Sequence, residues 1–130
     1  MKKIIYTVLG FFLAITVCSC GIISQTGTIT VKNNSGSTVT DIVLTYTHGN
    51  DGEQTKTIDS LINGAVKTVS AEVAHASWQT YVAGVAIEYI IGGMHFGEND
   101  ETGHGNNALT GGHEVVFTIY ADTWTVITNY

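Results

Sequence analysis

The sequence contains no proline and no arginine, only two cysteines, and few charged residues, 12% of its 130 positions. A nucleic-acid-binding protein needs a dense basic surface for phosphates, and five lysines against eleven acidic residues exclude that class. Disordered chains are rich in charge and poor in apolar residues, whereas 44% of this chain is hydrophobic. Abundant threonine, valine, isoleucine and glycine instead favour a single exported domain that is rich in β-structure.

The N-terminal segment has the pattern of a secretory signal peptide. Lys2 and Lys3 precede an apolar run, Ile4 to Val17, and small residues follow this run. The run is too short to cross a bilayer, which takes about 20 apolar residues. We therefore predict that residues 1–19 form a cleaved signal helix that takes no part in the fold.

The residues after the apolar run, Val17-Cys18-Ser19-Cys20-Gly21, place an aliphatic residue three positions before Cys20 and a small residue directly before it. This segment resembles the lipobox of bacterial lipoproteins. The resemblance implies that a diacylglyceryl group is attached to the thiol of Cys20, that the signal is cut just before this residue, and that the new amine is acylated. Cys18 is the second choice for the lipidated residue, because bulky Val17 stands directly before it, where a small residue is preferred.

The same resemblance implies a location for the mature protein. Gly21 stands where an Asp would favour retention in the inner membrane, so we expect the outer membrane of a bacterial envelope, with palmitate-type acyl chains as the anchor. A single acyl chain binds a membrane only marginally, so stable attachment takes two or more. Residues 20–26 are then predicted to form a lipidated tether, and residues 27–130 the domain.

Removal of the signal makes the protein more acidic and leaves it one cysteine. Three lysines and eleven acidic residues follow Cys20, a formal net charge of −8. An acidic domain is repelled by an anionic membrane surface, so we expect its own contacts to be with an envelope protein or a glycan. The single remaining cysteine cannot form a disulfide within the chain, and acylation protects its thiol.

The chain from Gly27 onward alternates apolar and polar residues, with Gly- and Asn-rich turns about every ten residues, which is typical of a sandwich or barrel. Glu53 to Ile58 is predicted to be an edge strand, since its Lys and Thr residues discourage pairing between molecules. Gly84 is interpreted as a bulge, and Ser70 to Trp78 as a segment with room for a helical turn. The predicted fold class is all-β: a single antiparallel β-sandwich of seven to eight strands.

Three pieces of the first half follow one another in a recognisable order. A strand and a small-residue turn span Ile29 to Gly36, a second strand spans Val39 to Tyr46, and Ile58 to Gly64 contains a Leu-x-x-Gly corner. In this order they resemble the immunoglobulin-like adhesion modules of bacterial envelope proteins. The resemblance implies an immunoglobulin-like sandwich and names no activity. The second half departs from such modules in its length and in a glycine-rich loop.

The segment Gly97 to Gly112 is the only long loop that the pattern predicts, and long loops in compact domains are often functional. Six residues in or near it have side chains of metal-binding type: Glu98, Asp100, Glu101, His95, His104 and His113. The three carboxylates are the oxygen ligands that Ca²⁺ prefers, and the three histidines with a carboxylate would suit Zn²⁺. Neither set has a known ligand spacing, so a solvated loop without a cofactor is the default expectation.

A ligand surface is predicted where the turn His48 to Gly52 adjoins this loop. Its candidate contact residues are His48, Asp51 and Trp78, while Trp124 is expected in the core because it shares a strand face with Val126. No serine lies in a nucleophile-elbow motif and no glycine-rich phosphate loop precedes a predicted helix, so catalysis is not expected.

These features together predict a lipid-anchored protein of the cell envelope that acts as a non-catalytic binding or structural module. Two alternatives stay open. The first is a Ca²⁺-dependent adhesin-like or carbohydrate-binding domain that uses the 97–112 loop. The second is an accessory or inhibitor of an envelope hydrolase. The expected partners are a membrane, through the lipid, and an envelope protein or a glycan.

Overall fold

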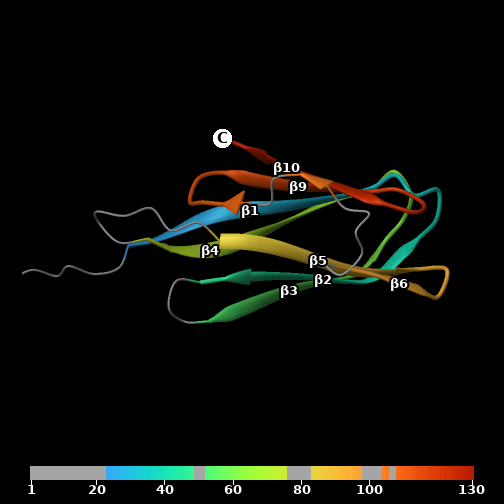
Figure 1. Ribbon diagram of the computed structural model, residues 1–130, viewed down its shortest axis with the longest axis horizontal. Helices are drawn as coiled ribbons and strands as arrows, with labels where there is room; N and C mark the ends of the chain where they lie inside the picture. The colour runs from blue at the N-terminus through green and yellow to red at the C-terminus, as the bar shows by residue number, and fades with distance from the viewer. Residues whose placement is uncertain (1–22, 49–51, 76–82, 98–103, 106–107) are drawn as a thin grey trace, which may run out of the picture.

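Two β-sheets packed face to face make up the part of the protein that the structure describes (Figure 1). The computed structural model describes residues 23–48, 52–75, 83–97, 104–105 and 108–130, and every regular element in these ranges is a strand. The elements are β1 (Ile23–Asn33), β2 (Val39–Thr47), β3 (Glu53–Leu61), β4 (Val66–His75), β5 (Ala83–Ile91), β6 (Met94–Phe96), β7 (His104–Gly105), β8 (Ala108–Leu109), β9 (Glu114–Ile119) and β10 (Trp124–Asn129). The predicted all-β sandwich is confirmed. The finer likeness to immunoglobulin-like modules stays a resemblance.

The order of the strands is β4-β1-β9-β10-β7 in the first sheet and β3-β2-β5-β6 in the second, with β8 paired to β5. Most neighbours run antiparallel, as predicted, but β1 runs parallel to β9 and β10 runs parallel to β7. The chain passes from one sheet to the other after β6, again after β7 and again after β8. It then enters β9 in the same direction as β1, which makes this pair parallel. A parallel pair needs such a crossover, whereas a hairpin can only give an antiparallel one.

The core lies between the sheets and follows the period-two pattern of the sequence. Ile42, Leu44 and Tyr46 of β2 are buried while their neighbours on the strand are not fully buried. The largest fully buried side chains are Tyr89, Phe117, Ile29, Ile42, Leu44, Ile87, Leu109 and Ile119. Each such side chain stabilises the fold by about 1.5–3 kcal/mol relative to an exposed position. Every residue of this core cluster lies within the segment from Ile29 to Val126.

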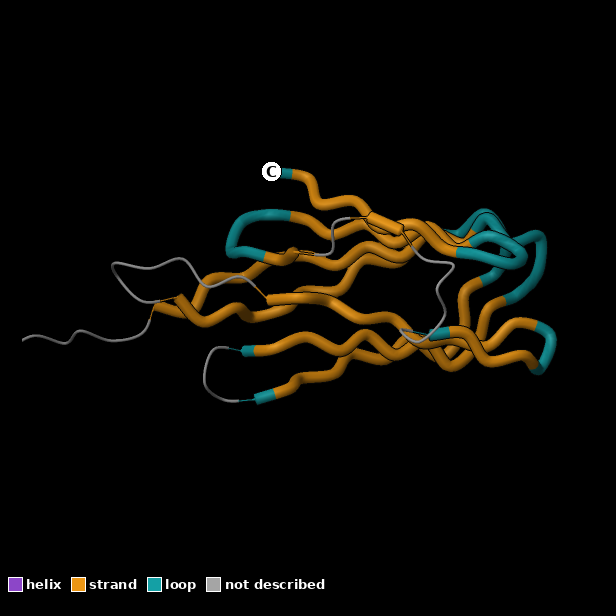
Figure 2. Tube along the Cα trace, viewed as in Figure 1, coloured by secondary structure: helices purple, strands orange, loops and turns teal. Residues whose placement is uncertain are grey.

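The sandwich has two ends, which we call proximal and distal. The proximal end holds the start of β1 and the end of β4, as the pair Ile23–His75 shows. Strand β9 begins farther along, where Glu114 pairs with Thr28 in the middle of β1. The distal end holds four turns, residues 34–38, 62–65, 92–93 and 120–123 (Figure 2). The 11 residues of β1 run from one end to the other, a distance of roughly 35 Å at about 3.3 Å per residue.

Several element boundaries differ from the prediction. The first strand begins at Ile23 rather than after Gly27, because its backbone continues to pair with β4 as far as His75. The helical turn predicted from Ser70 is wrong for residues 70–75, which belong to strand β4. The predicted loop of residues 97–112 contains the short strands β7 and β8, while residues 98–103 and 106–107 lie outside the described residues. Among the described residues, we find no helix with the length and hydropathy needed to cross a membrane.

The irregularity of the second sheet lies in β2 rather than at Gly84. The pairing of β2 with β5 shifts between Thr40 and Val43, and Asp41, between them, has a φ of 51°. A β-bulge commonly places one residue in this left-handed region, which Asp tolerates better than most residues. Gly84 lies in the regular part of β5, where an added Cβ would meet no atom within 4 Å.

A buried asparagine joins two of the distal turns. The side chain of Asn33 is fully buried, and its Nδ2 donates to the carbonyl oxygens of Leu61 (2.7 Å) and Ser37 (2.8 Å). Its Oδ1 accepts from both the backbone N–H (2.9 Å) and the hydroxyl (2.7 Å) of Ser35. The backbone N–H of Asn33 also donates to Ala65 at 3.0 Å. One side chain thus fixes the β1–β2 turn against the end of β3.

Candidate functional site

A polar groove lies along the open edge of the sandwich, where β3 and β4 are the outermost strands of their sheets. It has a volume of about 350 Å³, at the lower end of the range for small-ligand sites. Seven residues line it: Thr26, Tyr46, His48, Gln54, Lys56, Ser70 and Glu72. The lining offers hydroxyl, amide and imidazole groups together with one cation and one anion. A ligand with many hydrogen-bonding groups fits this chemistry best.

The position of two groove residues follows from the register of the second sheet. Gln54 pairs with Tyr46, and Lys56 pairs with Leu44, so both share the inward-facing side of β3 with buried Ile58. Because β3 is an edge strand, their side chains remain exposed at the rim of the groove. In the sequence, the sign of this groove is the presence of polar residues at inward-facing positions of a strand. The sequence pattern alone explains Lys56 only as a residue that discourages pairing between molecules.

Tyr46 connects the two sheets beneath the groove. Its side chain is 4% exposed, and burial is the main cause that raises the pKa of its phenol above the ordinary value of 10.0. A hydrogen bond with the backbone of Glu72 acts in the opposite direction, and the negative charge of Glu72 adds to the rise. The phenol therefore stays protonated near neutral pH, where it serves as a hydrogen-bonding group and not as a base.

The structure places one of the three predicted ligand-surface residues at this groove. His48 follows β2 and lines the groove, and its backbone N–H donates to the carbonyl of Gly52 at 3.1 Å to close the turn. Asp51 and Trp78 lie outside the described residues. Trp124 packs against the core as expected, with its ring centroid 5.7 Å from that of Phe117 and its side chain only half-buried.

A second polar cluster lies on the outer face of the first sheet, around Glu114. Thr30 donates from its hydroxyl to Oε1 of Glu114 at 2.6 Å, and Asn129 donates to Oε2 at 3.1 Å. The hydroxyl of Thr68 lies 2.8 Å from that of Thr30 and continues the network to β4. These hydrogen bonds, with a smaller contribution from the charge of Lys32, hold the pKa of the Glu114 carboxyl below its ordinary value.

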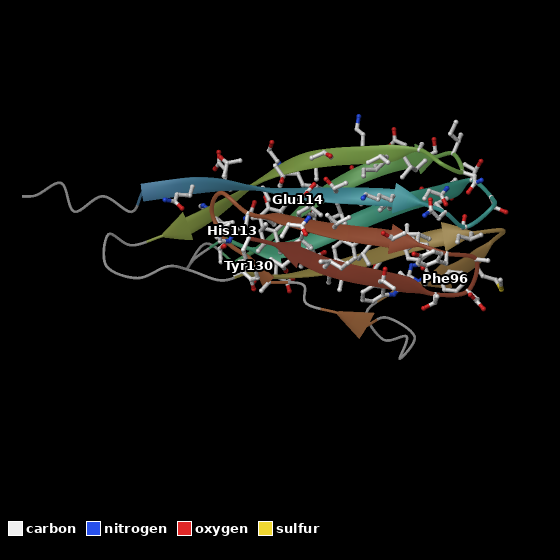
Figure 3. The ribbon with its side chains drawn as sticks, turned by 90° about the horizontal axis from the view of Figure 1, so that it is seen from above. Phe96, His113, Glu114 and Tyr130 are labelled. Carbon is white, nitrogen blue, oxygen red and sulfur yellow. The ribbon has the colours of Figure 1, made fainter. Side chains whose placement is uncertain are left out.

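Figure 3 shows Glu114 beside His113 and Tyr130, toward the proximal end, and Phe96 toward the other end. His113 lies in contact with the hydroxyl of Thr110 and edge-on to the ring of Tyr130, with the ring centroids 5.1 Å apart. Phe96 stacks on Tyr89 at 5.3 Å and closes the core at the β6 edge.

Some of the candidate metal ligands lie among the described residues and others do not. His95 is exposed on β6, paired with Ile90 near the distal end, whereas the carbonyl of His113 accepts from the N–H of Thr28 in the middle of β1, so these two are not brought together. The backbone of His104 forms β7 beside Thr125. Within the described ranges, no three His, Cys, Asp or Glu side chains gather in a way that suits a metal ion.

The remaining predicted ligands, Glu98, Asp100 and Glu101, lie outside the described residues, as does Cys20. The Ca²⁺ site therefore stays a prediction, and so does lipidation. Comparison of the chain with protein-family models, with curated proteins and with solved structures gave no match in any of the three.

Proposed function

We propose that this chain is a lipid-anchored protein of the bacterial cell envelope that acts as a non-catalytic binding or structural module. One juxtaposition carries the proposal: the lipobox-like cysteine, Cys20, stands directly before a β-sandwich that holds its own core. Three acyl chains on one cysteine supply a stable attachment at about 0.8 kcal/mol for each buried methylene group. The domain needs no apolar surface of its own to stay on the membrane.

Acylation of Cys20 is tested by replacing each cysteine in turn. In Cys20→Ser cells fed with labelled palmitate, the protein is expected to carry no label and to keep its signal peptide. Cys18→Ser is the matched control, two residues away and in the same segment. It should be labelled and cleaved as the natural chain is. Labelling of Cys20→Ser together with loss of label in Cys18→Ser would move the anchor to Cys18, and labelling of neither natural nor variant protein would overturn the proposal.

The groove between β3 and β4 favours carbohydrate as the ligand class of such a module. Sugars present many hydroxyl groups, and the groove lining supplies hydroxyl, amide and charged partners for them in a space of about 350 Å³. We therefore assign carbohydrate binding to the β3–β4 groove, whereas the alternative drawn from the sequence used the 97–112 loop. The described part of that loop, β7 and β8, is paired to β10 and β5.

Calorimetric titration with a panel of envelope oligosaccharides tests this ligand class. The double variant Gln54→Ala, Lys56→Ala removes two groove side chains, and Thr57→Ala, an exposed position on the other face of β3, is the control. We expect binding to be lost in the double variant and kept in the control. A natural chain that binds none of the panel, or a double variant that binds as well as the control, would refute the assignment of the groove.

A further inference from the structure

Two charged side chains of opposite sign line the β3–β4 groove. Lys56 belongs to β3 and Glu72 belongs to β4, the two edge strands between which the groove lies. Both side chains are exposed. In the part of the chain that the structure describes, no ion pair joins either of them to another residue. Both charges are therefore available to a ligand in the groove.

The surroundings of the two side chains direct their charges to the groove. Lys56 occupies an inward-facing position of β3, where the alternation of a sandwich strand calls for an apolar residue. Glu72 alternates with buried Ala71 and Val73 along β4. Burial is the main cause that raises the pKa of the Tyr46 phenol beneath the groove, and the negative charge of Glu72 adds to this rise. The carboxylate thus acts on the floor of the groove.

A groove with one cation and one anion favours a ligand that carries both charges as well. Lys56 attracts an anionic sugar that Glu72 repels, and the reverse holds for a cationic sugar. A neutral sugar that displaces water from the groove leaves both charges without a partner, which costs free energy. The whole chain also disfavours a purely anionic glycan, because three lysines and eleven acidic residues follow Cys20.

We propose that the β3–β4 groove binds a zwitterionic glycan, whose repeating unit carries one carboxylate and one ammonium group, with the carboxylate at Lys56 and the ammonium group at Glu72. This inference rests on the proposed binding of carbohydrate at the same groove and names the class of sugar. A lysine is a compact point charge and suits a single carboxylate. The hydroxyl groups of Thr26 and Ser70 and the amide of Gln54 meet the neutral hydroxyl groups of the sugar.

One oligosaccharide in four charge forms tests this inference. A hexasaccharide of alternating glucuronate and glucosamine, made by N-deacetylation of hyaluronan, carries both charges. Its N-acetylated form keeps only the carboxylates, its methyl ester keeps only the ammonium groups, and the form with both changes is neutral. Each form is titrated calorimetrically into the purified protein, at a slightly acidic pH that keeps the amine protonated and the carboxylate ionised.

We expect the form with both charges to bind about two- to fivefold more tightly than either singly charged form, as the free energy of an exposed charge pair implies. Lys56→Gln should abolish the preference for the carboxylate over its ester and keep the preference for the free amine. Glu72→Gln should do the reverse. Lys32→Gln and Glu88→Gln, which remove exposed charges outside the groove lining, are the matched controls and should keep both preferences.

Equal affinity for all four forms, tightest binding of a singly charged form, or no binding of any form would overturn the zwitterionic ligand. Loss of the same preference in both groove variants would overturn the positions of the two ligand groups. Failure of the proposed carbohydrate site looks different. In that case no oligosaccharide of the wider envelope panel binds, whereas a carbohydrate site that is insensitive to charge still binds neutral sugars of that panel.

Discussion

Replacement of Asn33 should destabilise the fold more than its place in a surface turn suggests. Asn33→Ala removes four side-chain hydrogen bonds, two donated to Leu61 and Ser37 and two accepted from Ser35, all within 2.9 Å. At about 1 kcal/mol for each bond, with a further cost for buried groups left without partners, the free energy of unfolding should fall by at least about 4 kcal/mol. That is a large part of the roughly 5–15 kcal/mol expected for a domain.

Thermal and urea unfolding of the chain without its signal peptide measures this effect, and a loss of about 4 kcal/mol corresponds to a fall in Tm of at least roughly 15 °C. Asn33→Asp is a more selective change, because it keeps the acceptor for Ser35 and turns an oxygen toward the Leu61 and Ser37 carbonyls. It should be no milder than Asn33→Ala. Asn34→Ala, at the exposed neighbouring position, is the control. Equal stability of Asn33→Ala and Asn34→Ala would refute the role of the buried network.

Two further predictions concern the first sheet and the close approach of β8. Because the pKa of Glu114 is lowered in the fold, its carboxylate contributes stability above the ordinary value of 4.5, and this contribution is lost as the pH falls through the lower folded pKa. Glu114→Gln should therefore flatten the dependence of Tm on pH below 4.5, and an unchanged slope would contradict the hydrogen-bond assignment. Gly27→Ala would place a Cβ 2.7 Å from Leu109 Cδ1 and 2.9 Å from the Thr110 carbonyl, so it should cost about 1–3 kcal/mol in urea unfolding. Gly84→Ala, in open space, should cost nothing, and equal losses in both variants would show that packing against β8 is not the cause.

The pattern of side chains predicted the strands well where one face of a strand is buried. The inward positions of β2, β5 and β9 follow directly from alternation of apolar and polar residues. The start of β1 could not be found in this way, because Ser24, Gln25 and Thr26 are all polar. Their strand conformation comes from backbone pairing with β4, which is a tertiary effect.

The pairing of the strands and the positions of the polar sites were harder to predict than the strands themselves. Nothing in the local pattern distinguishes a β9 that pairs parallel to β1 from one that pairs antiparallel, since the burial of alternate residues is the same in both. Asn33 lies in the segment from Ile29 to Gly36, for which the sequence predicts a strand and a turn, but its hydrogen bond to Leu61 joins residues 28 positions apart. The groove likewise depends on β3 and β4 lying at the same open edge, although Gln54 and Lys56 on the inward side of β3 gave a local sign of it.

The intact mass of the protein from the membrane fraction of its native host tests the central claim most directly. The account predicts a chain that begins at Cys20, with the added mass of a diacylglyceryl group and an amide-linked acyl chain on that residue. An unmodified chain in the soluble fraction, or a membrane-bound chain whose first residue is not Cys20, would contradict it.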